Sequence, residues 1–155
     1  MKVVIAIVWI ILTIMCESIV SAQSPIQNIN HQTIVSVTVN GSGPYPFLLN
    51  TGAQDMLIDP ALAVGWHLTD AGKNRDVYGI GGERKTVRTV IAAFTLAGQT
   101  LNMQAVVYAV PVPNRGYTPV YGIIGQAFLE HFIVTIDYVH STLTLTTAPV
   151  AVASK

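Results

Sequence analysis

Hydrophobic and polar residues alternate along several stretches of the chain, which is the pattern of β-strands that bury one face. Residues 33–39 show it most clearly, because valine there alternates with serine or threonine. Asn40 and Gly41 follow, and a second apolar run covers residues 45–49. Asn-Gly between two such runs predicts a tight hairpin turn, since both residues accept a positive φ.

Similar patterns recur along the rest of the chain. Further β-type runs cover residues 56–58, 86–96, 101–110, 121–125, 132–138 and 141–147. Asp59 followed by Pro60 is typical of a helix start, and residues 126–130 are expected to form a second short helix. Residues 69–75 are polar and are expected to link two strands. Because no strand–helix–strand spacing occurs, the pattern predicts an all-β fold of about seven or eight strands.

The start of the chain has the pattern of a secretory signal peptide, residues 1–22. Lys2 supplies a positive charge, residues 3–15 form an apolar run, and small residues precede Gln23. We expect cleavage after Ala22 and export to the periplasm or the extracellular space. The apolar run is shorter than the roughly 20 residues that span a bilayer. No membrane contact is therefore expected after cleavage, whereas an uncleaved leader would anchor the chain in a membrane.

The remaining residues are expected to form one domain, because 155 residues leave little room for two. Residues 23–32 are polar and are expected to be a mobile lead-in. Residues 33–147 contain the predicted strands and form the domain itself. Residues 148–155 are expected to be a frayed tail.

Composition excludes several classes of function. Eight basic and eight acidic residues give a formal net charge of zero, and without a basic run nucleic acid is not an expected partner. Cys16 is the only cysteine and lies in the predicted leader, so a thiol nucleophile and a cysteine-based metal site are excluded. The four histidines have no metal-ligand spacing. We therefore expect no metal and no cofactor.

Three segments, in order, carry a family resemblance. Residues 47–49 are apolar and run directly into Asn50-Thr51-Gly52-Ala53, a glycine-rich segment follows at residues 79–82, and an apolar strand precedes Gly125. The first segment resembles the active-site loop of aspartic proteases, in which the sequence is apolar-apolar-Asp-Thr-Gly-Ala. Together the three resemble the single-domain, retropepsin-like aspartic proteases over residues 33–145. The resemblance implies an acid-protease barrel with one or two short helices and a glycine-rich flap hairpin.

The resemblance also implies an assembly and a set of site residues. In that family two copies form a homodimer, each copy contributes one Asp, and the two carboxylates share a proton while an extended peptide or protein substrate is cleaved. The positions of the catalytic loop would be Asn50, Thr51 and Gly52. The substrate-binding positions would be Ala53, Tyr78, Gly79, Ile80, Gly81, Gly82 and Ile124.

Asn50 departs from the family pattern at the catalytic residue itself. An amide has nearly the shape of a carboxyl group, but it cannot ionise near neutral pH or accept a proton from water. The chain is therefore predicted to be inactive or strongly impaired as an endopeptidase. Three alternatives remain: a peptide-binding module, a dominant-negative partner of an active relative, and an exported β-barrel domain with a structural role. Other acids, including Asp55, Asp59 and Asp137, are expected to be structural.

Overall fold

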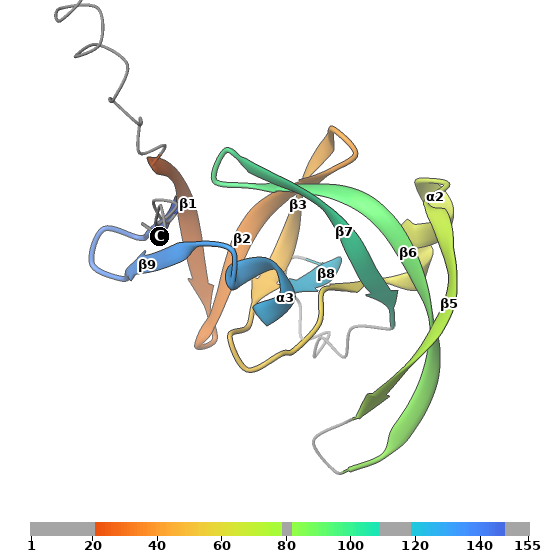
Figure 1. Ribbon diagram of the computed structural model, residues 1–155. Coiled ribbons are helices and arrows are strands. Elements are labelled where there is room, and N and C mark those ends of the chain that lie inside the picture. The colour runs from red at the N-terminus through yellow and green to blue at the C-terminus, as the bar shows by residue number, and fades with distance from the viewer. Residues whose placement is uncertain (1–20, 79–81, 109–118, 148–155) are drawn as a thin grey trace, which may run out of the picture.

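The computed structural model describes residues 21–78, 82–108 and 119–147. Within these ranges the chain forms ten strands and two short helices, so the expected all-β class is confirmed, with more strands than the seven or eight expected (Figure 1). The strands are β1 (Ser21–Ile29), β2 (Gln32–Val39), β3 (Ser42–Leu49), β4 (Leu57–Ile58), β5 (Thr69–Tyr78), β6 (Arg84–Leu96), β7 (Gln99–Val107), β8 (Gly122–Ile124), β9 (Ile133–Asp137) and β10 (Thr142–Thr146). The helices are α2 (Pro60–Gly65) and α3 (Gln126–Leu129).

The strands form a curved sheet that partly closes on itself. Their order is β5-β6-β7-β4-β8-β3-β2-β1-β10-β9, and an additional pairing joins β6 to β2. Most neighbours are antiparallel, whereas β3–β8 and β4–β7 are parallel. The β6–β2 pairing brings Thr38 opposite Thr95 and Val39 opposite Phe94. This closure gives part of the barrel-like ring that the resemblance implied.

The predicted turn at Asn40 and Gly41 is confirmed. Both residues have a positive φ, 49° and 78°, and they connect β2 to β3. The backbone N–H of Asn40 donates to the carbonyl of Ala93 at 2.8 Å, and the Asn40 side-chain oxygen accepts from the Ala93 N–H at 2.8 Å. The turn therefore closes the hairpin and also fixes it to β6.

The alternating valines of β2 point into the core, as their spacing predicts. Val35, Val37 and Val39 are at most 1% exposed, and they pack with Phe47 and Phe94, which are fully buried. Complete burial of side chains of this size contributes about 1.5–3 kcal/mol each. The core thus lies inside the ring and supports β3, the strand that leads to Asn50.

The expected helix start at Asp59 is also confirmed. Asp59 is the N-cap of α2, its carboxylate accepts a hydrogen bond from the Ala61 N–H at 2.8 Å, and Pro60 is the first helical residue. Among the residues that the structure describes, neither helix is long and apolar enough to cross a membrane.

Two polar segments form strands instead of the irregular structure that was expected. Residues 23–29, expected as part of a mobile lead-in, belong to β1, which pairs with β10 through residues 21–25 and with β2 through residues 26–29. Each half of β1 pairs with one neighbouring strand and Ile26 is buried in the core, so pairing and burial outweigh its mostly polar composition. Residues 69–75, expected as a link, begin β5 and pair with β6.

Several expectations concern residues outside those that the structure describes. The leader up to residue 20, the loop at residues 109–118 and the tail at residues 148–155 are among them. Cleavage after Ala22 therefore stays a prediction. Ala22 itself lies in β1, opposite Leu145 of β10.

Candidate active site

The Asn50 loop begins where β3 ends. Leu49 is the last residue of the strand and is buried, whereas Asn50, Thr51 and Gly52 are exposed. The side-chain oxygen of Asn50 accepts a hydrogen bond from the Gly52 N–H at 3.0 Å, and its carbonyl accepts one from the Ala53 N–H at 3.1 Å. The side chain and the backbone of Asn50 thus both hold the turn.

Strand β8 supports the loop from the other half of the chain. It runs parallel to β3, with Leu48 opposite Ile123 and Leu49 opposite Ile124. The Asn50 N–H continues this ladder by donating to the Ile124 carbonyl at 3.0 Å. Because β3 and β8 lie inside the sheet, the position of Asn50 is set by main-chain pairing and not by flexible side chains.

The segment after the loop rests against Gly125. A Cβ atom at Gly125 would overlap the carbonyl oxygen of Asp55 and would lie 2.8 Å from that of Ala53, so glycine is needed for this close approach. The first residues of α3 add hydrogen bonds: the Gln126 N–H donates to the Ala53 carbonyl at 2.7 Å, and the Ala127 N–H donates to the Gln54 carbonyl at 3.0 Å. Residues 50–55 are therefore held as one rigid segment.

Asn50 and Thr51 lie at an open depression of about 340 Å³. Its other lining residues come from the β1–β2 turn, from the ends of β2 and β3, and from β9 and the residue after it: His31, Gln32, Thr33, Leu48, Leu49, Ile136 and Tyr138. The sequence did not indicate His31 or Tyr138 as site residues, because neither has a motif and both reach the loop only through the fold.

The remaining predicted site residues lie in different surroundings. Ile124, expected to contact substrate, is fully buried. Its backbone carbonyl accepts the hydrogen bond that the Asn50 N–H donates. Ala53 is half-buried. Tyr78 ends β5 with 71% of its surface exposed, and Gly82 is exposed with φ 79°. Gly79, Ile80 and Gly81 lie outside the described residues.

The carboxylates nearest in sequence to Asn50 are both engaged. Asp55 forms an ion pair with Arg75, with 2.8 Å between Oδ1 and Nη1. Asp59 caps α2. Both fit the structural roles expected from the sequence, so neither is available in this arrangement to replace a catalytic carboxylate.

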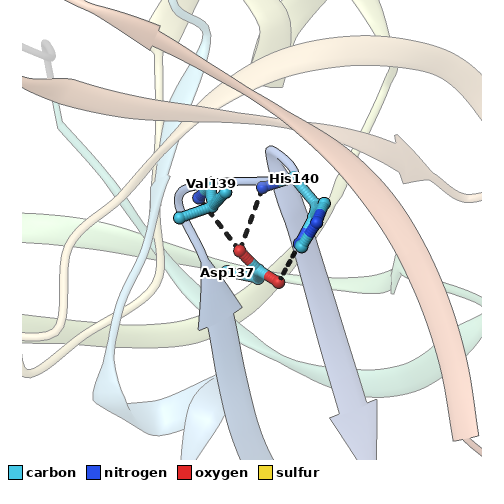
Figure 2. Close-up of polar contacts among 3 residues, drawn as sticks. All are labelled: Asp137, Val139 and His140. Carbon is cyan, nitrogen blue, oxygen red and sulfur yellow. Dashed lines mark hydrogen bonds and ion pairs between the residues drawn. The ribbon is translucent and has the colours of Figure 1, made fainter.

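Asp137 fits the structural role expected for it (Figure 2). One carboxylate oxygen accepts hydrogen bonds from the backbone N–H groups of Val139 at 2.9 Å and His140 at 3.0 Å, and the other lies 2.6 Å from Nδ1 of His140. The hydrogen bond with the His140 ring, more than any other contact, lowers the pKa of Asp137, and the same bond raises the pKa of His140. The pair closes the β9–β10 turn.

Within the described ranges, no group of three or more His, Cys, Asp or Glu side chains could hold a metal ion. The loop itself offers an amide, a threonine hydroxyl and backbone N–H groups, which can form hydrogen bonds with a ligand but do not ionise near neutral pH.

The sequence and the fold are both similar to those of known proteases. Residues 35–128 match the sequence profile of the aspartyl protease family. A retropepsin-like aspartic protease from Rickettsia conorii is similar in structure, with a TM-score of 0.59 and 17% identity over 84% of this chain and 92% of that chain. The EIAV protease complexed with the inhibitor HBY-793 has a TM-score of 0.50 and 19% identity over 67% of this chain and 90% of that chain. A search of curated proteins gave no match.

Proposed function

This chain belongs to the aspartyl protease family, and we propose that it binds extended peptides or proteins at the Asn50 loop while hydrolysing them slowly or not at all. One observation carries the proposal. The side-chain oxygen of Asn50, which the resemblance puts at the position of the catalytic Asp, accepts a hydrogen bond from the Gly52 N–H. A carboxylate oxygen could accept the same bond, so this turn suits either side chain, but only the carboxylate ionises.

The chemistry of an aspartic protease explains why asparagine at this position would reduce hydrolysis more than binding. One carboxylate of the dyad takes a proton from the attacking water while the protonated one polarises the scissile carbonyl. The amide of Asn50 can donate a hydrogen bond, but it cannot take the proton from water, because it neither ionises nor accepts a proton near neutral pH. General-base assistance alone is worth about 10²–10⁴-fold in rate. Binding depends instead on shape and backbone hydrogen bonds, which the substitution leaves in place.

We propose a homodimer in which two Asn50 loops face each other, as the family resemblance implies. Two observations support it. Asn50 and Thr51 are exposed at an open depression of the single chain, as a site shared between two copies requires. Ile133, Tyr138 and Val139, in and just after β9, are exposed large hydrophobic residues. Thr51 would join the paired loops.

The experiment that tests the function compares binding and cleavage in one assay. The purified chain and its Asn50→Asp variant are each incubated with a library of fluorogenic peptides, and fluorescence polarisation and product formation are followed together. Binding by both proteins with cleavage by the variant alone supports the proposal. Pepstatin-sensitive cleavage by the unmodified chain refutes the inactivity, and absence of binding by both proteins refutes the peptide site.

A second candidate function follows from the same preserved loop. A chain that keeps the dimer surface but lacks the carboxylate could pair with an active relative and inactivate it, because the mixed dimer holds one carboxylate where two are needed. Mixing the chain with its own Asn50→Asp variant tests this directly. A loss of activity larger than dilution explains would support the inhibitory role.

Export is proposed on the leader pattern. Residues 1–22 have the charge, the apolar run and the small residues of a secretory signal. The exported protein would then have no cysteine, since Cys16 lies within the leader.

A further inference from the structure

The outer half of the β5–β6 hairpin, which we call the distal hairpin, comprises residues 74–78 of β5 and residues 84–88 of β6. Pairing of β6 with β7 begins only at Thr89, so among the described strand pairings residues 84–88 pair with β5 alone. Figure 1 shows β5 and β6 extending beyond the other strands as a curved ribbon. A two-stranded hairpin by itself is marginally stable in water. The position of the distal hairpin therefore depends on its contacts with the rest of the protein.

The register gives the distal hairpin two chemically different faces, because side chains of directly paired residues share a face. One face carries Arg75, Val77, Lys85 and Val87. The opposite face carries Asn74, Asp76, Tyr78, Arg84, Thr86 and Arg88. On the first face the two valines are half-buried and the two basic residues are exposed, whereas on the opposite face every residue except the half-buried Asp76 is exposed. We call the first face the inner face and the second the outer face.

Polar contacts of the outer face stay within strands β5 and β6. The Asp76 carboxylate accepts hydrogen bonds from Arg84, at 2.5 Å, and from the Thr86 hydroxyl, at 2.7 Å. The bond from Arg84, followed by the bond from Thr86, lowers the pKa of Asp76. These bonds hold the two strands together, but they do not determine where the hairpin lies relative to the rest of the protein.

Polar contacts of the inner face reach the body of the protein at two places. Arg75 binds Asp55 at 2.8 Å, and Asp55 belongs to the rigid segment that contains Asn50. The side chain of Asp55 is only 14% exposed, whereas that of Arg75 is 46% exposed. The Asp55 side chain is thus largely buried in the body of the protein, and the more exposed Arg75 side chain extends from the hairpin to it.

Lys85 makes the second contact with the body. Its Nζ donates a hydrogen bond to the Tyr108 hydroxyl at 3.1 Å and lies 5.4 Å from the centre of the ring, within cation–π range. The backbone of Tyr108 is anchored, because its N–H donates to the Ile58 carbonyl at 3.0 Å. Glu83, two residues before Lys85, lies 4.0 Å from the same ammonium group and is the weaker partner.

We infer that Arg75 and Lys85 are positioning residues that hold the distal hairpin in a fixed place relative to the Asn50 loop, through Asp55 and Tyr108. Breaking either contact leaves the β5–β6 register unchanged, but it lets the distal hairpin move and lets its ladder open more often. The consequence for ligands rests on the proposed function: a peptide bound at Asn50 would enter and leave faster when the hairpin is loose. The hairpin's own position does not depend on that proposal.

Hydrogen–deuterium exchange of the intact chain tests the positioning. Arg75→Gln and Asp55→Asn should each speed exchange in residues 74–78 and 84–88 by roughly two- to five-fold, the range of a partly exposed ion pair. The double variant should show no more than either single one, because both remove the same interaction. The Asp55→Asn variant is the more informative of the two, because Asp55 lies outside the hairpin and its substitution changes none of the residues whose exchange is measured. The charge-swapped Asp55→Arg/Arg75→Asp variant should restore slow exchange.

Arg88→Gln is the matched control. Arg88 is 45% exposed, close to the exposure of Arg75, and its ion pair with Asp70, at 3.9 Å, joins two residues of the same two strands. It should speed exchange in the distal hairpin less than Arg75→Gln does, because this longer ion pair joins the two strands only to each other. Tyr108→Phe, which keeps the ring and removes the hydroxyl, should add its own effect to that of Arg75→Gln.

Exchange in Asp55→Asn equal to that of the unmodified chain overturns the inference.

A ligand measurement separates this inference from the proposed function. Association and dissociation rates of the tightest-binding library peptide should both rise by roughly two- to five-fold in Arg75→Gln, so its affinity changes less than either rate. If no peptide binds any variant but exchange responds as expected, the proposed function fails and the positioning stands. If peptides bind but neither exchange nor rates respond, the positioning fails and the proposed function stands.

Discussion

The side-chain oxygen of Asn50 accepts a hydrogen bond from the backbone N–H of Gly52, with 3.0 Å between the two atoms. A carboxylate oxygen in the same place would accept that bond as well, and more strongly, because hydrogen bonds to charged acceptors are stronger. The loop is therefore shaped equally for an amide and for a carboxyl group. This relationship makes position 50 the most informative site for substitution.

Asn50→Asp is expected to raise kcat/KM for peptide cleavage by at least about 10²–10⁴-fold, because it supplies the missing general base. Cleavage should be favoured at acidic pH, where one carboxyl of a facing pair keeps its proton. A pH series of a fluorogenic peptide assay measures both effects. Asn50→Ala serves as the control and should stay inactive. Equal rates for the unmodified chain and Asn50→Asp would contradict the prediction.

Thr51→Ala is expected to shift the proposed homodimer toward monomer, because the resemblance gives this exposed threonine a role in joining the two loops. Sedimentation velocity over a range of concentrations measures the shift. Ser36→Ala, at an exposed position of β2 away from the loop, is the control and should leave the dimer unchanged. A chain that is monomeric at every concentration before any substitution would remove the basis of the proposed dimer.

Gly125→Ala is expected to lower the free energy of unfolding by about 1–3 kcal/mol, the usual cost of forcing an extra group into a packed site. The added Cβ would overlap the Asp55 carbonyl and crowd that of Ala53. Gly65→Ala is the matched control, since a Cβ there has nothing within 4 Å. At this last position of α2 alanine should be neutral or stabilising by about 0.4–1 kcal/mol. Urea unfolding distinguishes the two, and equal losses would contradict the packing argument.

The Asp137–His140 pair predicts a pH-dependent contribution to stability. The pKa of His140 is raised, so its contribution is complete below its ordinary value of 6.5 and is lost as the pH rises through the raised pKa. The pKa of Asp137 is lowered, so its contribution is complete above its ordinary value of 3.8 and is lost as the pH falls through the lowered pKa. Both contributions are present between these two ordinary values.

His140→Gln should therefore lower the melting temperature more at pH 5–6 than at pH 9. Scanning calorimetry of both proteins across this range measures the difference. His131→Gln removes a histidine elsewhere on the protein and is the control for general charge effects. A melting-temperature difference that grows toward pH 9 would contradict the assigned ion pair.

Cleavage of the leader after Ala22 is expected to leave a folded domain. Only Ser21 and Ala22 of the described part of β1 would be lost, whereas residues 23–29 keep their pairing with β10 and β2. Expression with export and intact-mass measurement would find a chain that begins at Gln23. A chain recovered only in membranes, with its leader intact, would favour the anchored alternative.

The sequence by itself determined those features that depend on neighbouring residues. Alternating valines predicted β2, Asn40-Gly41 predicted its turn, and Asp59 before Pro60 predicted the start of α2. The apolar run into Asn50 also predicted a strand that ends in a glycine-containing loop. Each of these signals is local, because strand periodicity, positive φ and helix capping involve residues only a few positions apart.

Only the tertiary structure decided what depends on residues far apart along the chain. The mostly polar residues 23–29 became a strand because their first part pairs with β10 and their second part with β2. Arg75 meets Asp55, and Ile124 supports Asn50, because the folded sheet brings these segments together. Main-chain groups pair with whichever strand lies alongside, whatever their own side chains, so no local pattern records the partner. The contacts that place the Asn50 loop and the distal hairpin are of this second kind.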